Sequence, residues 1–209
     1  LQIAKAIIQE IIKATVMPVK DPRIIMIPVQ KKDWKPKPTE IRKAQKIVLP
    51  GVGAMQPAMD KLQNLGLVTV IEESLRPGKP FLGICVGLQL LFEKSFEGGD
   101  VQGLGILPGT VERFQSLKIP HMGWNQLEIK NSVCPLFSGV EDTANVYFCH
   151  SYYVRPQDAA ITATTTDYGV EFVSSIQKKN IFGVQFHPEK SQTIGLKILK
   201  NFVQLPDKI

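Results

Sequence analysis

The sequence has 209 residues, of which 44% are hydrophobic and 21% charged, a composition typical of an ordinary globular protein. The length favours one domain over residues 1–209. The net charge of +6 comes from scattered lysines and arginines, which indicates a basic solvated surface rather than a nucleic-acid groove. No apolar run approaches the roughly 20 residues of a membrane span, so we expect neither a nucleic-acid partner nor a membrane.

The first elements are predicted from apolar spacing. Isoleucines at helical intervals predict a helix over 3–14, RIIMIPV (23–29) is a short buried strand, and WKPKP (34–38) is an extended connector. KIVLPGVGA (46–54) reads as a strand that enters a glycine turn, and 55–76 as helical in one or two pieces. A strand over 80–84 and a helix over 86–94 follow. Strands alternating with helices in this way predict a parallel sheet.

The second half of the chain changes character. It contains mainly short strand patterns, at 110–114, 125–129, 145–149, 152–156, 161–165, 171–177 and 181–186. A last helix is predicted over roughly 190–204. No change in composition marks a linker, so we predict an α/β fold with a mostly parallel sheet flanked by helices and a β-rich second half.

Cysteine usage limits the class of protein. Cys85, Cys134 and Cys149 are odd in number and lack the spacing of a disulfide framework. No C-x-x-C pair is present, so a zinc site is not expected. We predict a reducing, cytoplasmic location, with Cys134 and Cys149 as structural thiols.

Cys85 stands between two glycines in PFLGICVGLQLLF, where a strand ends and a helix begins. Gly83 and Gly87 remove side chains where the strand and helix must approach each other, as in the G-x-S-x-G elbow of serine hydrolases. A helix N-terminus favours a thiolate, which is the nucleophilic form of cysteine. The alternative interpretation is a buried structural cysteine.

A thiolate nucleophile needs a base, and His187 in FGVQFHPEKS is the best candidate. Pro188 favours an extended conformation at His187. Residues two apart in an extended chain point the same way, so we expect Glu189 to orient the imidazole of His187, as in a triad.

The other two histidines are weaker candidates. His150 lies in the strand-like FCHSYYV, where a structural or site-wall role is favoured over that of a base. His121 lies in IPHMGWNQ, which we interpret as a glycine-containing loop and a candidate surface for a partner.

Acyl transfer also requires backbone donors for the developing oxyanion. We expect one from the amide of Val86, directly after the nucleophile, and a second from LPGVG (49–53), at Val52. The two glycines of LPGVG would let the backbone approach a ligand closely, although the motif alone also fits a simple turn.

Taken together, LPGVGA, GKPFLGICVGLQLLF, IPHMGWNQL, YFCHSYYV and GVQFHPEKS resemble the class I (triad) glutamine amidotransferases. PHMGWN, the HSYY run and HPEKS are more similar to the glutaminase subunits of imidazole glycerol phosphate synthases. The matching blocks occur in order over about 39–205. The resemblance implies the flavodoxin-like amidotransferase fold.

The resemblance also implies a mechanism: Cys85 attacks the side-chain amide of glutamine, His187 moves protons and Glu189 orients His187. A thioester forms, ammonia leaves and water releases glutamate. The ammonia would pass, in histidine biosynthesis, to a cyclase partner with a (β/α)8 barrel, as a heterodimer. No metal or cofactor is implied. The implied glutamine-binding residues are Gly51, Gly53, Gln89, Ser151 and Tyr152, and the implied partner-facing residues are His121, Met122, Gly123, Trp124 and Asn125.

Two features depart from the family pattern. Val86 stands where leucine is usual, which matters little because the expected donor is backbone. The family opens with a strand and a D-Y-G-x-G-N loop, whereas residues 1–38 contain no glycine. We therefore predict that 3–14 and 23–29 supply a helix and a parallel strand in a replaced first segment.

Three alternatives stay open. The altered first segment suggests a catalytically silent subunit of the same fold that still binds a barrel partner. Another class I amidotransferase would serve anthranilate, aminodeoxychorismate or guanylate synthesis, which PHMGWN argues against. A general cysteine hydrolase could use the same triad.

Overall fold

The computed structural model describes residues 23–29, 37–76, 78–115 and 117–208. The predicted helix over 3–14 lies outside these residues, as do the first three residues of the predicted connector 34–38. The prediction of a parallel strand within 23–29 is confirmed, because β1 (Ile24–Met26) pairs in parallel with β2 (Lys46–Gly51).

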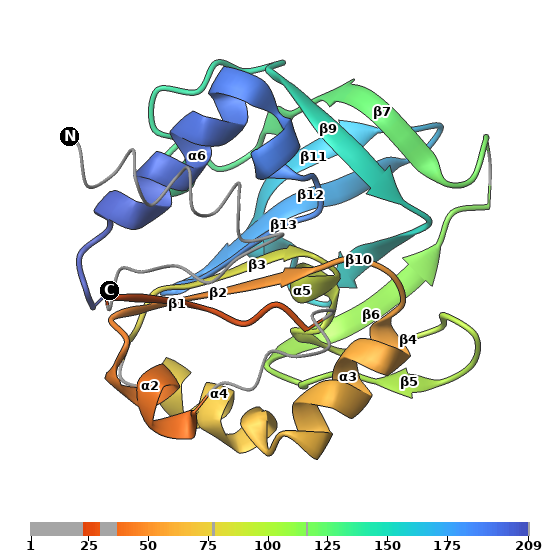
Figure 1. Cartoon of the computed structure of the whole chain (residues 1–209). Coiled ribbons are helices and arrows are strands. Elements are labelled where there is room, and N and C mark those ends of the chain that lie inside the picture. Colours follow the sequence, from red (N-terminus) through yellow and green to blue (C-terminus); the bar gives the residue numbers. More distant parts are fainter. Residues whose placement is uncertain (1–22, 30–36, 77, 116, 209) are drawn as a thin grey trace.

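Four neighbouring parallel strands carry the first half of the fold. Their order is β1, β2, β3 (Phe81–Cys85) and β13 (Ile181–Val184). β3 is buried along its whole length, as expected for a strand with helices on both faces. Helices α2 (Pro38–Lys43), α3 (Met55–Asn64) and α4 (Leu67–Leu75) cover one face, and α6 (Gln192–Gln204) covers the other (Figure 1).

Beyond β13 the sheet becomes mainly antiparallel. In the described part of the chain it has eleven strands, and its path continues through β12 (Glu171–Lys178), β10 (Tyr152–Pro156), β6 (Leu107–Arg113), β4 (Phe92–Ser95) and β5 (Val101–Gln102). β11 (Thr162–Asp167) branches from β12, and β8 (Glu128–Ile129) pairs with β11. The predicted α/β class and β-rich second half are confirmed. Among the described strands, however, parallel pairing is confined to β1, β2, β3 and β13 and to the β4–β6 pair. Strands joined by short turns pair antiparallel, whereas parallel pairing needs a crossover.

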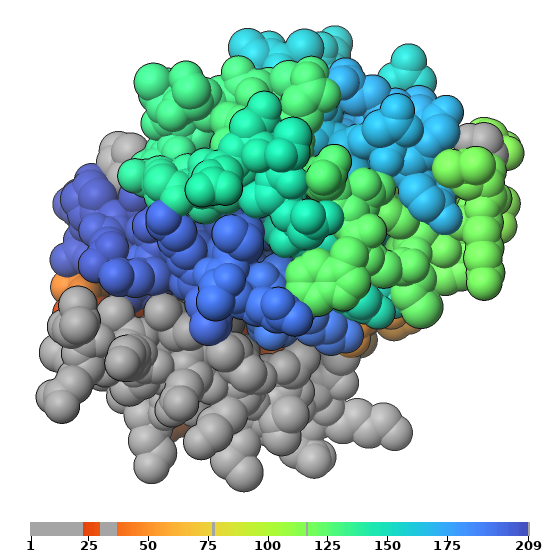
Figure 2. Space-filling model, turned by 90° about the horizontal axis from the view of Figure 1, so that it is seen from above, coloured from red at the N-terminus to blue at the C-terminus, as the bar shows by residue number. Residues whose placement is uncertain are grey.

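A separate pair of strands, β7 (His121–Gln126) and β9 (Asn145–His150), stands beside the main sheet. Seen from above, the green-to-teal chain around this pair lies beside the blue segment of α6 (Figure 2). The side chain of Asn201 on α6 donates to the carbonyls of Leu136 and Ser138, at 2.8 and 3.0 Å. Leu136 lies within the short 3₁₀ helix η1 (Pro135–Phe137), and Ser138 directly follows it. Two further 3₁₀ helices are η2 (Ala159–Ile161) and η3 (Pro188–Lys190).

Two predicted elements are wrong. The helix expected over 86–94 ends after four residues, as α5 (Val86–Gln89), and Phe92 begins β4. Leu88, Leu91 and Phe92 are fully buried, and a short apolar run fits a helix or a strand equally well. The expected loop around His121 is strand β7. Among the described residues, no helix is long and apolar enough to cross a membrane.

Candidate active site

Cys85 occupies a strained elbow between β3 and α5. Its φ of 54° and ψ of −110° correspond to the first central position of a type II′ turn, which favours glycine. The residue is 3% exposed, and Gly51 lies opposite it in the β2–β3 register. A strained non-glycine residue at the end of a central strand is a frequent mark of a functional position.

The glycines around the elbow are required by close packing. A Cβ atom on Gly87 would overlap the carbonyl oxygen of Leu49, and one on Gly51 would lie 2.7 Å from the Cβ of Val86. The helix can therefore approach β2 and β3 only with a bare backbone, as the sequence predicted for Gly87. Gly53 has open space around it and a φ of 90°, so its backbone turns sharply after β2.

His187 and Glu189 are brought together, although not in the predicted way. The Nδ1 of His187 lies 2.7 Å from Oε1 of Glu189, and because a carboxylate accepts, the ring donates. We expected an extended chain, but Pro188–Lys190 forms η3 directly after His187. Proline is well suited to the first position of a helical turn, and this turn carries Glu189 back to the ring. His187 itself is extended, with φ −100° and ψ 94°.

The electrostatics of His187 favour its charged form. Burial alone would lower the pKa of His187, but hydrogen bonds and charge interactions with Cys85 and Glu189 raise it well above the usual 6.5. The second carboxylate oxygen of Glu189 is buried and has no hydrogen-bond partner among the described residues. The arrangement can therefore hold a proton taken from the Cys85 thiol.

Gln185 is a site residue that the sequence reasoning missed. It is fully buried, and its Nε2 donates to the sulfur of Cys85 at 3.6 Å. Its Oε1 accepts from Nε2 of Gln89 at 3.1 Å, and that same nitrogen lies 3.0 Å from the carbonyl oxygen of Tyr152. A glutamine inside an apolar strand end, two residues before His187, is the signal that could have identified it.

The remaining predicted site residues differ in their exposure and in the elements that carry them. Val86 is the first residue of α5 and is buried, whereas Val52 follows β2 and is 44% exposed. Ser151 joins β9 to β10, and its carbonyl accepts from the amide of Phe114 at 3.1 Å.

The predicted partner-facing residues lie on both faces of strand β7. Met122 and Trp124 are 60% and 49% exposed, but His121 is only 3% exposed. We therefore correct the expectation for His121, because alternate residues of a strand point to opposite faces and His121 faces inward. Asn125, on the same face as His121, is half-buried, and so is Gly123.

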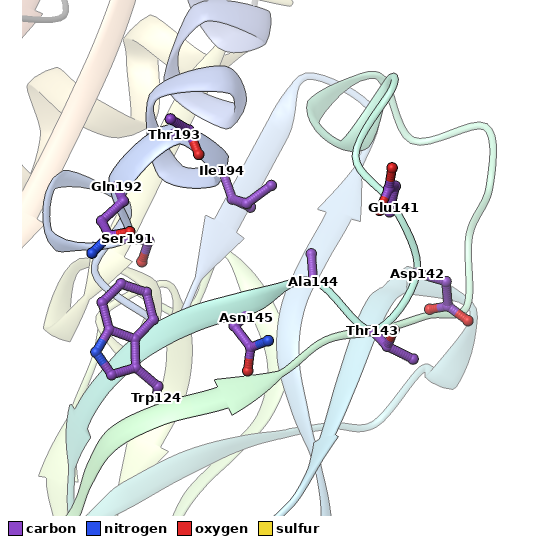
Figure 3. Close-up of a pocket in the computed structure, with 10 residues that line it drawn as sticks. All are labelled: Trp124, Glu141, Asp142, Thr143, Ala144, Asn145, Ser191, Gln192, Thr193 and Ile194. Atoms are coloured by element: carbon purple, nitrogen blue, oxygen red, sulfur yellow. The ribbon is translucent and has the colours of Figure 1, made fainter.

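A pocket of about 390 Å³ opens beside this strand pair (Figure 3). Trp124 lies on one side with Ser191 and Gln192 near it, and Glu141, Asp142 and Thr143 lie on the other side. Ser191 ties the pocket wall to His187, because its hydroxyl donates to the carbonyl of His187 at 2.7 Å. Among the described residues, no cluster of His, Cys, Asp or Glu is arranged to hold a metal ion.

The family model described as glutamine amidotransferase class-I matches residues 2–205. The chain belongs to this family. It is thus an enzyme of the glutamine-hydrolysing amidotransferases.

Among relatives of this amidotransferase, "Imidazole glycerol phosphate synthase subunit HisH" of Geobacter sulfurreducens is 53% identical, over 80% of this chain and 84% of the relative. The protein of the same name from Pyrococcus furiosus is also 53% identical, over 80% of this chain and 86% of its own length. A solved structure titled "Crystal structure of glutamine amidotransferase" superposes with a TM-score of 0.64 at 15% identity, covering 94% of this chain and 90% of that one. At this identity the structural likeness supports the fold alone.

Proposed function

We propose that this chain is the glutaminase subunit of an imidazole glycerol phosphate synthase, and that it supplies ammonia to a cyclase partner in histidine biosynthesis. The observation that carries the proposal is the His187–Glu189 pair beside Cys85, in a chain half identical to subunits of that name.

The chemistry follows from the three groups. His187 takes the proton of the Cys85 thiol, and the sulfur attacks the side-chain amide carbon of glutamine. His187 returns the proton to the leaving nitrogen, so that ammonia departs and a thioester stays. Water, deprotonated by the same imidazole, attacks the thioester and releases glutamate and the thiol. Glu189 holds Nδ1–H throughout and stabilises the imidazolium.

The other roles in the proposal rest on position. The amides of Val86 and Val52 would stabilise the oxyanion. Gly51, Gly53, Gln89, Ser151 and Tyr152 would hold the glutamine. Two observations support this: Gly51 lies opposite Cys85 in the β2–β3 register, and Gln89 donates to the carbonyl of Tyr152. Met122 and Trp124 would contact the partner, for which we propose a (β/α)8-barrel cyclase in a heterodimer.

We further propose that the chain forms one domain. The pairing of β13 with β3, 100 residues apart at Ile181 and Phe81, supports it, since the two halves share one sheet. The three cysteines are free thiols, which supports a reducing, cytoplasmic location.

The test is glutamate release from glutamine by the purified chain, with and without a barrel cyclase and its nucleotide ligand. We expect turnover that the partner stimulates and that Cys85→Ala removes while the complex still forms, because the side chain is small and lies in the site. A folded chain that binds the cyclase without any turnover would instead identify a silent subunit. Turnover that persists in Cys85→Ala would contradict the thioester mechanism.

A further inference from the structure

Two buried histidines are surrounded by a cluster of aromatic rings beside the site. His121 and His150 lie opposite each other in the β7–β9 register and are 3% and 6% exposed. The ring of His121 stacks on Tyr168 and Phe148, at centroid distances of 3.9 and 4.8 Å. The ring of His150 contacts Phe114 and Phe172, both at 5.3 Å. None of the catalytic steps proposed above uses either ring.

The hydrogen bonds of this pair fix both tautomers. Nδ1 of His150 lies 2.8 Å from the carbonyl oxygen of Tyr152. Because a carbonyl can only accept, Nδ1 of His150 carries the hydrogen and its Nε2 accepts. The donor to that Nε2 is Nδ1 of His121, at 3.0 Å. Nε2 of His121 in turn accepts from the amide of Asn125 at 3.3 Å, and that amide also donates to the carbonyl of Asp167 at 2.8 Å.

Burial keeps both rings neutral. Removal from water lowers the pKa of His121 to about 4 and that of His150 to about 3. The series of hydrogen bonds thus keeps one direction at neutral pH, from Asn125 through both rings to the carbonyl of Tyr152.

The series does not end at Tyr152. The same carbonyl accepts a second hydrogen bond, from Gln89, which also donates to Gln185, and Gln185 donates to the sulfur of Cys85. Hydrogen bonds therefore run without a break from β7, through the backbone carbonyl of Tyr152, to the nucleophile. If His150 stopped donating, Gln89 would be the one side-chain donor left to the carbonyl of Tyr152 among the described residues.

We propose that His121 and His150 are positioning residues: they hold the carbonyl of Tyr152 and, through Gln89 and Gln185, the Cys85 thiol and the bound glutamine. His150 acts directly on the carbonyl. His121 acts by holding the tautomer of His150, since the other tautomer would turn a lone pair toward an oxygen that can only accept. The part that concerns glutamine rests on the function proposed above.

Three variants distinguish a positioning role of these histidines from a role in packing alone. His150→Phe keeps an aromatic ring but cannot donate. His150→Asn loses the ring, but its amide nitrogen occupies about the place of Nδ1 and can still donate to Tyr152. His121→Phe keeps the stack on Tyr168 and removes the donor to His150.

We expect His150→Phe to lower kcat/KM for glutamine about tenfold, mainly through KM, because a buried polar group loses its partner. His150→Asn should recover to within about threefold of the parent, and His121→Phe should lie between the two. A structural role would reverse the order, since Phe retains the aromatic packing and Asn does not. Assays contain the cyclase partner and its nucleotide ligand.

A second readout does not depend on turnover. The rate of Cys85 alkylation by iodoacetamide, followed by mass spectrometry of its peptide, should fall about threefold or more in His150→Phe and recover in His150→Asn. Equal rates in both variants and the parent, or a faster rate in Phe than in Asn, would overturn the positioning role. A parent without glutamine turnover would count against the proposed function alone, because the alkylation rates would still decide the positioning role.

Discussion

The β3–α5 elbow carries Cys85, whereas the β7–β9 strand pair is linked to it only through a series of hydrogen bonds, and the two are constructed in opposite ways. At the elbow the backbone determines the geometry, since Cys85 is held at a positive φ and Gly87 leaves no room for a Cβ atom beside the carbonyl of Leu49. In the strand pair the side chains determine it: Trp124 points outward and His121 inward, where it enters a series of hydrogen bonds. We therefore expect a single substitution at the elbow to cause a large loss of stability, whereas substitutions in the strand pair should change binding, rate or stability by smaller amounts.

The sharpest test of that contrast is Gly87→Ala. We expect a loss of roughly 3 kcal/mol or more in the free energy of unfolding, because the added Cβ overlaps backbone that cannot move aside. Chemical denaturation measures it. Gly98→Ala is the matched control: Gly98 has a φ of 73° and open space, so about 1–2 kcal/mol of strain is expected. Equal losses in the two variants would mean that the elbow is not tightly packed.

Glu189→Gln should act on rate rather than on folding. The amide oxygen can still accept from Nδ1 of His187, but the negative charge that favours the imidazolium is lost. We expect kcat for glutamine hydrolysis in the complex to fall by roughly 100-fold without reaching zero. Glu141→Gln, in the neighbouring loop, should leave kcat unchanged. An unaltered rate in Glu189→Gln would remove Glu189 from the triad.

Trp124→Ala tests the outward face of the strand pair. Loss of an exposed aromatic anchor should weaken cyclase binding by about 2 kcal/mol, as measured by calorimetry. Alkylation of Cys85 in the free chain should not change, because Trp124 points away from the hydrogen-bonded series. Val133, 85% exposed, supplies the control Val133→Ala. Normal affinity in Trp124→Ala would show that this face does not contact the partner.

The two histidines on the inward face of the strand pair should make the free energy of unfolding depend on pH. The pKa values of His121 and His150 fall from 6.5 to about 4 and about 3 on folding, so below pH 6.5 the unfolded chain binds more protons. The free energy of unfolding should therefore decrease between pH 6 and pH 4, by up to about 1.4 kcal/mol per pH unit for each ring. The raised pKa of His187 acts above pH 6.5 and does not offset this decrease.

Urea denaturation at pH 7, 6, 5 and 4 measures the slope. His121→Phe should flatten it, because one of the two buried rings no longer gains a proton on unfolding. A parent whose stability stays level down to pH 4 would mean that the rings are hydrated in the folded state.

Much of the fold was predictable because apolar alternation and glycine turns are local signals. The strands at 46–51, 81–85 and 152–156 and the helix at 192–204 appear within a few residues of the prediction. The prediction of a helix beyond Gln89 was wrong because a brief apolar run does not show whether its spacing is that of a helix or of a strand. β7 was missed because glycine and polar residues in IPHMGWNQ are typical of a loop, and only pairing with β9 makes it a strand.

The site residues also divide into those that local sequence predicts and those that it does not. Cys85, His187 and Glu189 could be nominated from neighbouring residues alone, through the elbow glycines and the H-P-E spacing. The contacts of Gln185 and the His121–His150 pair could not be predicted, because the partners lie 100 and 29 residues apart and meet only through strand register. Such contacts depend on tertiary pairing, which no local pattern encodes.

The backbone angle at Cys85 has a consequence for how this position can evolve. Glycine is the residue that relaxes a turn of this kind, so the nucleophile occupies a place where folding alone would prefer another residue. A library of this chain selected purely for resistance to heat should accumulate Cys85→Gly, whereas selection for growth without histidine should retain cysteine. Variation at this single position would then report which of the two pressures a population has experienced.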